Sequence, residues 1–580
     1  EQRRIDLLIR AKKGIRNITV LNILIKRNVI EEHHLRFNED FIYYSDLPFV
    51  EGLVMYGNKI AFDEETLYAK RKHNDPINTP ALSQIKDETK FDEFINVYKY
   101  AISLVDKESR IRYYLDSKMI KYYSNYFAKK IRRSKNDFWR DERFDQMTLL
   151  MKNVRDDLLK NMSRYQQKMV KLSRNHDLSG TQKVIAKHLA KSKLKKMLKN
   201  KNEVNKYLYR HRYLKEPIEE NWIMFETFMG KSYADSPKYI YEYLAKNYPG
   251  KYKFIWVLND SKEKLPYEGI IVKRFTKKYA YYLAKSKYFV FNIRQPLWFR
   301  KREGQVFLET WHGTPLKRLA FDQEEVTAAS PTYKAQFYRQ KQEWDYLIAA
   351  NKFSSDIFKS CFMYTNGTML EIGYPRNDLL YAPNKDEIAL ELKKKLHIPL
   401  DKKTILYAPT WRDDEYYGKG KYKFKLKLDL EMMKKELGDD YVILLRTHHY
   451  IADSLDVTGV EDFAINLSKY DDITEIYLIS DICITDYSSV FFDFANLKRP
   501  MLFYTYDIDK YRDVLRGFYI DMEKELPGPL VYSTNEVIEQ IKNIDEMTQK
   551  YAQRYEEFYQ RFCSIDDGQA SKRACEAVFK

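Results

Sequence analysis

The segment from which the fold is read most directly is Asp481-Ile482-Cys483-Ile484-Thr485-Asp486-Tyr487-Ser488-Ser489-Val490-Phe491-Phe492-Asp493. The apolar run that leads into it begins at Tyr477 and is interrupted only by Ser480 and Asp481. After two hydroxyl side chains, the apolar residues recur at helical spacing. This change of period predicts a strand, a tight turn and a helix, with Ser488 and Ser489 in the first turn.

Such a turn suits a phosphate group. It gathers unpaired backbone N–H groups, two hydroxyl donors and the positive end of a helix dipole in one place. Asp493 follows Ser489 by four residues, so on a helix its carboxylate faces the same ligand and can accept hydrogen bonds from sugar hydroxyls. The alternative is that Ser488 or Ser489 only caps a buried helix.

Length and charge bound the class of protein. A chain of 580 residues has room for two to four domains, and a 44% hydrophobic content can fill their cores. The formal net charge of +18 indicates an anionic partner, either a nucleic acid, a phosphorylated substrate or an acidic lipid.

The cysteines and the apolar runs indicate a compartment. Four cysteines without CxxC spacing argue against a zinc site and a disulfide framework, so we expect a reducing cytoplasm. No apolar run reaches the roughly 18 residues that cross a bilayer, so any membrane contact is expected to be peripheral. The sequence begins at Glu1 without an initiator Met, and we expect an upstream piece to be missing.

Two acidic segments lie near the start of the chain, at 35–40 and 44–49. They resemble the acidic segment in the later half of GT-A glycosyltransferases, whose usual nucleotide-binding first half has no counterpart in this sequence. We therefore expect residues 1–150 to form a partial GT-A-like α/β domain with a structural or docking role. Three carboxylates are either acceptor-side groups or ordinary solvated side chains: Glu39, Asp40 and Asp46.

A basic helical pattern follows at 151–216. Its lysines alternate with apolar residues and predict an amphipathic helix with a cationic face, which suits an anionic membrane surface. A solvated linker helix is the alternative, and no nucleic-acid motif accompanies the charge. The lysines are Lys183, Lys187, Lys191, Lys193, Lys195, Lys196, Lys199 and Lys201.

The remaining chain alternates short apolar strands with amphipathic helices. The first set of expected strands is 222–225, 254–257, 288–291, 306–308 and 346–349. The second set is 404–407, 442–445, 482–484 and 501–503. These continuous apolar runs predict two doubly wound, Rossmann-type α/β domains at 217–390 and 391–580.

Polar motifs follow four of these strands. Because ligands bind beyond the carboxyl ends of parallel strands, we expect the four motifs to line one cleft. The motifs are Glu309-Thr310-Trp311-His312-Gly313-Thr314-Pro315, Ala408-Pro409-Thr410-Trp411-Arg412, Arg446-Thr447-His448-His449 and Thr485-Asp486-Tyr487-Ser488-Ser489.

These motifs, together with Gly373-Tyr374-Pro375-Arg376-Asn377-Asp378, closely resemble the CDP-glycerol glycerophosphotransferases of wall teichoic acid synthesis in Gram-positive bacteria. The resemblance runs from about Asn221 to the end, and the preceding region makes the poly(glycerol phosphate) polymerase branch the nearest. It implies a GT-B-like fold and a peripheral enzyme on the cytoplasmic face of the membrane. The implied substrates are CDP-glycerol and an undecaprenyl-diphosphate-linked disaccharide primer that carries glycerol phosphate.

Glycerophosphoryl transfer needs a base, donors for the phosphoryl oxygens and a place for CMP. His312 is the expected base, since an unperturbed imidazole has a pKa near ~6.5 and Gly313 permits close approach. The second expected catalytic residue, His448, lies beside Arg446 and suits charge stabilisation. The family pattern assigns importance to both histidines.

The other expected contacts with CDP-glycerol divide among the phosphates, the ribose and the nucleotide wall. The serine pair would hold the diphosphate, Asp493 the ribose, and Arg376 a phosphate or the cytidine edge. For Trp311 and Trp411, core packing is the alternative, and for His449 it is favoured. The full expected set is Trp311, Gly313, Thr314, Pro315, Arg376, Pro409, Thr410, Trp411, Arg446, Thr447, Ser488, Ser489 and Asp493.

No cofactor is required by this chemistry, and no ATP or NAD phosphate loop follows any strand. Mg²⁺ is possible but not indicated, because the acidic pairs 413–414, 471–472 and 566–567 lie in polar segments where carboxylates are usually solvated. Three alternatives stay open: a CDP-ribitol enzyme, a primase that adds only a few units, and a non-catalytic scaffold for anionic polymer or membrane. A homo-oligomer is possible.

Overall fold

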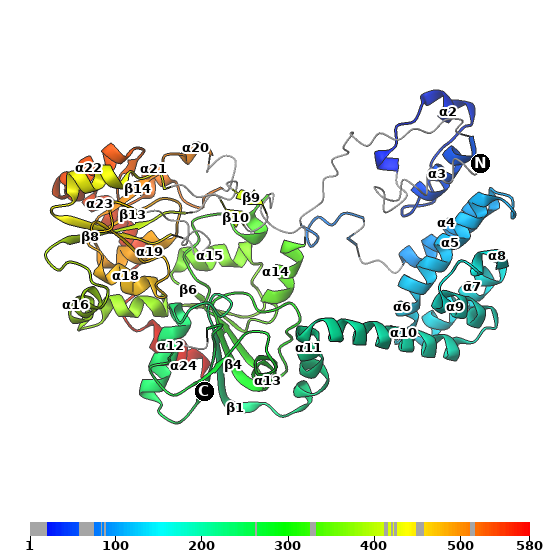
Figure 1. The fold of residues 1–580 in the computed structure, drawn as a ribbon, viewed down its shortest axis with the longest axis horizontal. Helices are drawn as coiled ribbons and strands as arrows, with labels where there is room; N and C mark the ends of the chain where they lie inside the picture. Colours follow the sequence, from blue (N-terminus) through cyan, green and yellow to red (C-terminus); the bar gives the residue numbers. More distant parts are fainter. Residues whose placement is uncertain are drawn as a thin grey trace. The chain divides into compact units, whose positions relative to one another are not determined.

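The computed structural model describes residues 20–56, 75–82, 84–85, 89–260, 264–324, 332–410, 416–418, 421–422, 426–447, 457–510 and 517–579. The chain forms two compact units (Figure 1). The first holds the described residues from 20 to 201 other than 75–78, and the second holds 75–78 and the described residues from 202 onward.

The first unit is helical. Within its described residues there is no strand, so the α/β character expected of residues 1–150 is not found there. Apolar side chains at 91, 94, 95 and 98 recur at spacings of three and four, which builds one buried helical face rather than an alternating strand. The helices are α2 (Arg27–Glu32), α3 (Asp46–Tyr56), α4 (Thr89–Ser103), α5 (Arg110–Tyr122), η3 (Tyr123–Phe127), α6 (Ala128–Arg133), α7 (Asp137–Asn153), α8 (Asp156–Leu159), α9 (Arg164–Arg174) and α10 (Leu178–Lys199).

The first unit has one core, and this core crosses the expected boundary at residue 150. That boundary falls inside α7, and Met169 of α9 and Ile185 of α10 are buried in the same cluster as Phe91 and Leu115. Residues 151–216 are therefore not a separate linker, because their first half packs as part of the helical unit. Glu39 and Asp40 are exposed, as expected for solvated carboxylates.

The basic helix α10 changes character along its length. Its first half packs on the core through Ile185, Val184 and Leu189, while residues 190–196 are exposed on every face. Among the lysines stand two exposed leucines one helical turn apart, Leu194 at 57% and Leu198 at 80% exposure. No described helix is long and apolar enough to cross a membrane.

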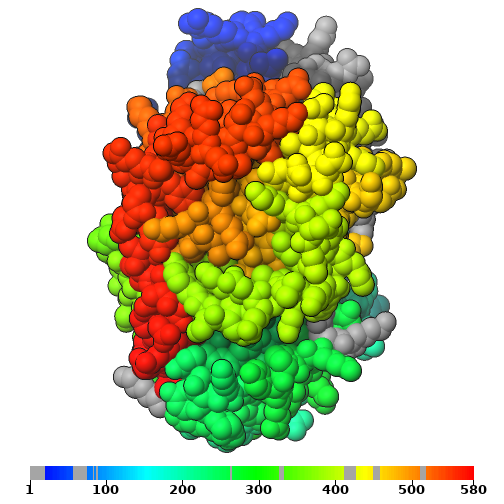
Figure 2. Space-filling model, turned by 90° about the vertical axis from the view of Figure 1, so that its left-hand side faces the viewer, coloured from blue at the N-terminus to red at the C-terminus, as the bar shows by residue number. Residues whose placement is uncertain are grey.

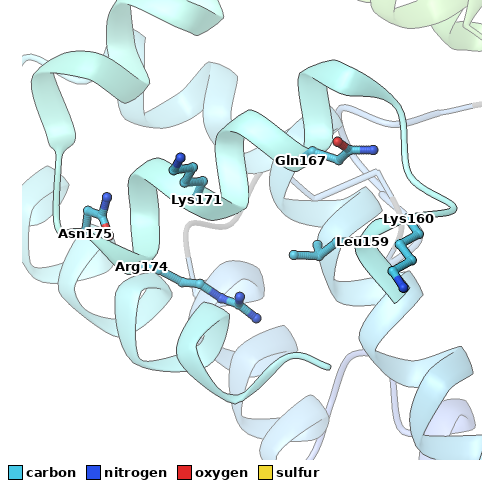
Figure 3. A pocket seen from close by; sticks show the side chains of 6 residues that line it. All are labelled: Leu159, Lys160, Gln167, Lys171, Arg174 and Asn175. Carbon is cyan, nitrogen blue, oxygen red and sulfur yellow. The ribbon is translucent and has the colours of Figure 1, made fainter. Parts of the chain in front are cut away.

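A cavity of about 360 Å³ lies in the helical unit beside α8 and α9 (Figure 3). Its most basic side chain is already occupied, since the Arg174 guanidinium donates to the carbonyl oxygens of Met151 and Val154 and pairs with Asp156. The cavity is lined by Leu159, Lys160, Gln167, Lys171, Arg174 and Asn175.

The second unit contains a first parallel sheet in the order β3-β2-β1-β4-β5-β6-β7. The chain runs outward from β1 to β3 and then continues on the other side of β1 from β4, so the topology reverses between β1 and β4. All five strands expected here are confirmed. The strands are β1 (Glu219–Glu226), β2 (Lys253–Val257), β3 (Ile270–Val272), β4 (Ser286–Phe291), β5 (Val306–Glu309), β6 (Tyr346–Ala349) and β7 (Thr368–Glu371).

A second parallel sheet follows, in the order β12-β11-β8-β13-β14-β15. Its topology reverses between β8 and β13, and the four expected strands are confirmed. The strands are β8 (Lys403–Ala408), β11 (Tyr441–Leu445), β12 (Ala464–Asn466), β13 (Ile482–Thr485), β14 (Met501–Tyr504) and β15 (Leu530–Val531). A two-stranded antiparallel ribbon pairs β9 (Tyr416–Gly418) with β10 (Lys421–Tyr422).

Helices cover both sheets (Figure 1). Each sheet is buried between two apolar clusters, one on each face, which explains the continuous apolar runs of its strands. The helices are α11 (Lys201–His211), α12 (Asp235–Asn247), α13 (Lys277–Lys285), α14 (Tyr333–Lys341), α15 (Lys352–Cys361), η6 (Pro375–Tyr381), α16 (Lys385–Lys395), α17 (Leu430–Leu437), α18 (Ile473–Ile479), α19 (Val490–Phe494), α20 (Ile508–Lys510), α21 (Met522–Glu525), α22 (Thr534–Lys542), α23 (Ile544–Phe562) and α24 (Ala570–Val578).

The last helix returns to the first sheet. Ala574 and Val578 of α24 are buried in the cluster that covers this sheet, and the ring of Phe579 lies 5.0 Å from that of Tyr288. In Figure 2 the C-terminal residues, in red, run down the molecule from the second sheet domain onto the green first one. The expected domain at 391–580 therefore loses its final helix to the preceding domain.

Candidate active site

His312 is held by the end of a neighbouring strand. It follows β5, and its Nδ1 lies 2.7 Å from the carbonyl oxygen of Asn292, which follows β4. A carbonyl only accepts, so Nδ1 carries the proton and donates, and Nε2 keeps its lone pair. Trp311 adopts φ 53°, a strained left-handed conformation for a bulky residue, and this turns the chain sharply between strand and imidazole.

The environment keeps His312 neutral. Desolvation by the surrounding protein is the largest effect on its pKa and lowers it, although part of the ring is open to solvent. The hydrogen bond to Asn292 and the charge of Asp235 act in the opposite direction, and the nearby guanidinium groups of Arg376 and Arg294 lower the pKa further. A neutral imidazole with a free Nε2 is the state that a general base requires.

The predicted serine turn faces the histidine loop. A β-carbon placed on Gly313 would lie 2.8 Å from the Oγ of Ser489, so a larger residue at this contact between the two sheet domains would have to displace the serine side chain. Ser489 is the residue before α19, but its side chain does not cap that helix. Within the described part of the chain, neither Ser488 nor Ser489 has a side-chain hydrogen bond, which leaves both hydroxyls available to a ligand.

The turn is fixed by a buried aspartate at the reversal point of the second sheet. Asp486 accepts from the backbone N–H of Thr410 at 2.8 Å and from that of Tyr487. Thr485 also donates to the carbonyl oxygen of Ala408 at 2.7 Å. The ends of β8 and β13 are therefore tied together, and this brings the expected residues Pro409 and Thr410 beside the serine turn.

Arg376 and Asp493 bind each other rather than facing a ligand. The Arg376 guanidinium is 2% exposed and lies 2.8 Å from both Asp493 and Asp235. The carboxylates hold the pKa of Arg376 well above its ordinary value against the effect of burial. Both terminal nitrogens of Arg376 and the Asp493 carboxylate therefore bind protein groups, while Nε of Arg376 is buried without a hydrogen-bond partner among the described residues.

The network extends from this arginine in two directions. On one side, Asp235 accepts a hydrogen bond from the side chain of Asn292 at 2.9 Å. The backbone carbonyl of Asn292 in turn accepts the Nδ1–H of His312. On the other, Asn377 bridges Asp493 and Asp566. Burial raises the pKa of Asp566 to about 7. This continuous buried network joins the base to the second sheet domain.

Arg446 and Thr447 support a loop. The Arg446 guanidinium donates to the carbonyl oxygens of Leu467, Ser468 and Tyr470, and Thr447 bonds to Ser468. Burial lowers the pKa of Arg446. Because Nη1 of Arg446 donates to backbone oxygens, its contacts are those of a residue that stabilises a loop rather than of one that binds a phosphate.

The remaining expected residues fall into two groups. Thr314 and Pro315 are buried just before a segment that crosses between the sheet domains, where Leu316 accepts from the N–H of Tyr519 at 2.9 Å. Trp311 is 8% exposed and packs against Phe362, so its indole is largely core. His448, His449, Trp411, Asp413 and Asp414 lie outside the described residues.

In each of the two acidic pairs that the structure describes, one carboxylate is buried, contrary to expectation. Asp472 is 2% exposed and pairs with Lys238 at 2.7 Å, and Asp566 is buried in the network described above. Their polar neighbours are protein groups, which explains their burial. In the part of the chain that the structure describes, no three His, Cys, Asp or Glu side chains form a group that could hold a metal.

Three residues of this site were not expected, Asp235, Asn292 and Arg294, and Glu309 was expected only as part of a motif that lines the cleft. Asn292 and Arg294 follow an expected strand, so the signal that marked the other motifs was present there too. Asp235 does not directly follow an expected strand, so no motif marked it. It begins α12 with φ 61° and lies in the site only because of the tertiary fold. Glu309 is the last residue of β5, and no sequence pattern indicated that it would be fully buried.

Comparison with known proteins gives matches along nearly the whole chain. The family described as CDP-Glycerol:Poly(glycerophosphate) glycerophosphotransferase matches residues 207–580. The teichoic acid poly(glycerol phosphate) polymerase of Staphylococcus epidermidis is 39% identical over 98% of this chain and 79% of its own length. That of Bacillus subtilis is 46% identical over 67% of this chain, which spans 53% of that protein.

A solved structure is also similar. The wall teichoic acid polymerase TagF is 46% identical, with a TM-score of 0.63, over 67% of this chain and 95% of the solved chain.

Proposed function

Because this chain belongs to the CDP-glycerol:poly(glycerophosphate) glycerophosphotransferase family, we propose that it is a teichoic acid poly(glycerol phosphate) polymerase. It transfers glycerol phosphate from CDP-glycerol to the terminal hydroxyl of a lipid-linked primer and releases CMP. The observation that carries this proposal is the contact of the His312 loop with the serine turn at Gly313, because base and phosphate donors from two domains meet there.

The chemistry divides between the two sides of this contact. The acceptor hydroxyl gives its proton to Nε2 of His312 while its oxygen attacks the phosphorus that bears glycerol. The bond between that phosphorus and the bridging oxygen breaks, and CMP leaves with the electron pair. The Nδ1–H bond to Asn292 fixes the tautomer and stabilises the imidazolium that forms.

The serine turn serves the donor. Ser488 and Ser489 donate to the diphosphate oxygens, with the start of α19 behind them and Pro409 and Thr410 along the nucleotide wall. His448, which the family pattern singles out, supplies positive charge to the phosphoryl group. Arg376, Asp493 and Arg446 act by holding these parts in place, as their buried contacts support.

The basic helix α10 is the proposed membrane-binding surface of the enzyme. The lysines of α10 and its exposed Leu194 and Leu198 suit anionic lipid on the cytoplasmic face, where a lipid-linked primer is presented. Replacing Lys191, Lys195 and Lys199 by glutamine should weaken binding to anionic vesicles more than turnover on a soluble acceptor. Equal vesicle binding by the variant would reject this surface.

The function is tested by incubating the protein with radiolabelled CDP-glycerol or CDP-ribitol and a primer that carries glycerol phosphate. Long products from CDP-glycerol alone, with CMP released in proportion, are expected. Addition of one or two units would indicate a primase, and label from CDP-ribitol alone would indicate the ribitol enzyme. Absence of CMP with every acceptor would favour a scaffold.

A further inference from the structure

Arg294 lies in the turn that holds the candidate base. This turn follows β4, and its first residue, Asn292, accepts the Nδ1–H of His312 and donates to Asp235. Arg294 is two residues further along, and its charge is close enough to affect the pKa of His312. The guanidinium therefore belongs to the His312 side of the site, in the first sheet domain.

The guanidinium is fixed by aromatic rings and one amide. It lies over the rings of Tyr333, at 5.1 Å, and Phe337, at 4.8 Å, both on α14. One of its nitrogens donates to the side-chain oxygen of Gln340 at 3.2 Å. Gln340 is itself fixed, because its side-chain amide donates to the backbone carbonyl of Gln295 and the side-chain amide of Gln295 donates to the backbone carbonyl of Gln340.

Within the part of the chain that the structure describes, no acidic side chain lies at ion-pair distance from Arg294. Among the described residues it forms no ion pair, whereas Arg376 in the same site has two carboxylates. The acidic side chain that interacts with it most is Glu309, which is fully buried, and burial holds the pKa of that carboxyl well above its ordinary value. Glu309 forms no ion pair with Arg294, so it uses none of the N–H donors of the guanidinium.

An arginine has five N–H donors in a rigid fork, and the described residues use one of them here. Keeping a partly desolvated cation without a counter-ion is costly, and such sites are relieved by an anionic ligand. The fork matches the geometry of a phosphate or phosphodiester.

We propose that Arg294 binds a phosphodiester of the acceptor chain next to the hydroxyl that His312 deprotonates. This inference rests on the proposed function. The donor diphosphate belongs to the serine turn of the second sheet domain, so an anion bound on the His312 side comes from the acceptor. Arg294 is then a specificity-determining residue that favours acceptors carrying glycerol phosphate over uncharged ones.

The test is the effect of Arg294→Gln on the KM values of the two substrates, with a soluble disaccharide bearing one glycerol phosphate as acceptor. The KM for this acceptor should rise by about tenfold or more, while the KM for CDP-glycerol changes by less than about threefold. Arg339→Gln is the matched control, because Arg339 is an exposed arginine on α14, the helix whose rings contact Arg294, and its replacement should leave both KM values unchanged.

Arg294→Lys keeps the charge without the fork, and an intermediate acceptor KM is expected from it even if the glutamine variant folds poorly. An unchanged acceptor KM in a folded Arg294→Gln protein would overturn the proposal, and a rise in the KM for CDP-glycerol alone would move Arg294 to the donor. Failure of the unmodified protein to transfer glycerol phosphate would instead reject the proposed function.

Discussion

Nδ1 of His312 lies 2.7 Å from the carbonyl oxygen of Asn292, and the side chain of Asn292 in turn bonds to Asp235. The same residue therefore sets the tautomer of the base and connects it to the buried carboxylates. This link explains how His312, which lies in a loop after β5, is held in a fixed position relative to charged groups of both sheet domains.

Replacing His312 by alanine removes the base but no core packing. We expect transfer to fall by about 10²–10⁴-fold or more, with an unchanged melting temperature. The measurement is CMP release at saturating CDP-glycerol, with circular dichroism as the check on folding. Turnover within a few-fold of the unmodified protein would exclude His312 as the base.

The pH dependence of the reaction follows from the lowered pKa of His312. Because the base must be neutral, kcat/KM should fall on acidification, and the midpoint should lie below the ~6.5 of an unperturbed imidazole. At pH 7, kcat/KM should therefore already be close to its maximum. An acid limb centred above pH 7 would point to a different titrating group.

Gly313 and Ser489 should behave as a coupled pair. In Gly313→Ala the new methyl group displaces the Ser489 hydroxyl, since the two atoms would be 2.8 Å apart. We expect each single variant, Gly313→Ala or Ser489→Ala, to raise the KM for CDP-glycerol by about tenfold. The double variant should be little worse than either, because both changes remove the same hydroxyl contact.

Additive losses in the double variant would show that Gly313 and Ser489 act separately, and the assignment of this contact to the donor phosphates would then fail.

The buried network should matter for stability. Arg376→Met leaves the carboxylates of Asp235 and Asp493 buried without their cation, and we expect a loss of about 3–5 kcal/mol in the free energy of unfolding. The control is Lys287→Met, whose partner Glu220 is largely exposed and whose loss should cost about 1 kcal/mol or less. Urea denaturation compares the two, and equal midpoints would contradict the argument.

The sequence was sufficient to predict the sheets of the second unit. Strands buried on both faces are continuous apolar runs, and all nine expected strands are present. The short strands at sheet edges were missed, and β7 shows why, because its residues are exposed or half-buried and give no such run. The apolar run from Tyr477 to Ile484 is also not one strand. Tyr477 to Ile479 form the end of α18, and the strand begins only at Ile482.

The site was predicted where strand ends carry polar motifs, as at His312 and the serine turn. The site could not be predicted where side chains that are distant in the sequence contact each other in the folded protein. Arg376 and Asp493 are 117 residues apart and pair inside the molecule. No local pattern indicates that Arg376 also meets Asp235, so the sequence does not show that Arg376 and Asp493 are buried together.

The helical first unit shows a limit of a different kind. Resemblance to a short acidic segment indicated an α/β domain, but the periodicity of the residues around Phe91 and Tyr98 is helical, and their burial in one core follows that periodicity. Local hydrophobic spacing was the better guide there than a partial motif.

The most direct test of the central claim is a parallel measurement of CMP release and of label incorporated into primer by the unmodified protein, His312→Ala and His448→Ala. The account predicts one CMP for each glycerol phosphate added by the unmodified protein and loss of both signals in each folded variant. Normal incorporation by His312→Ala, or incorporation without CMP, would contradict it.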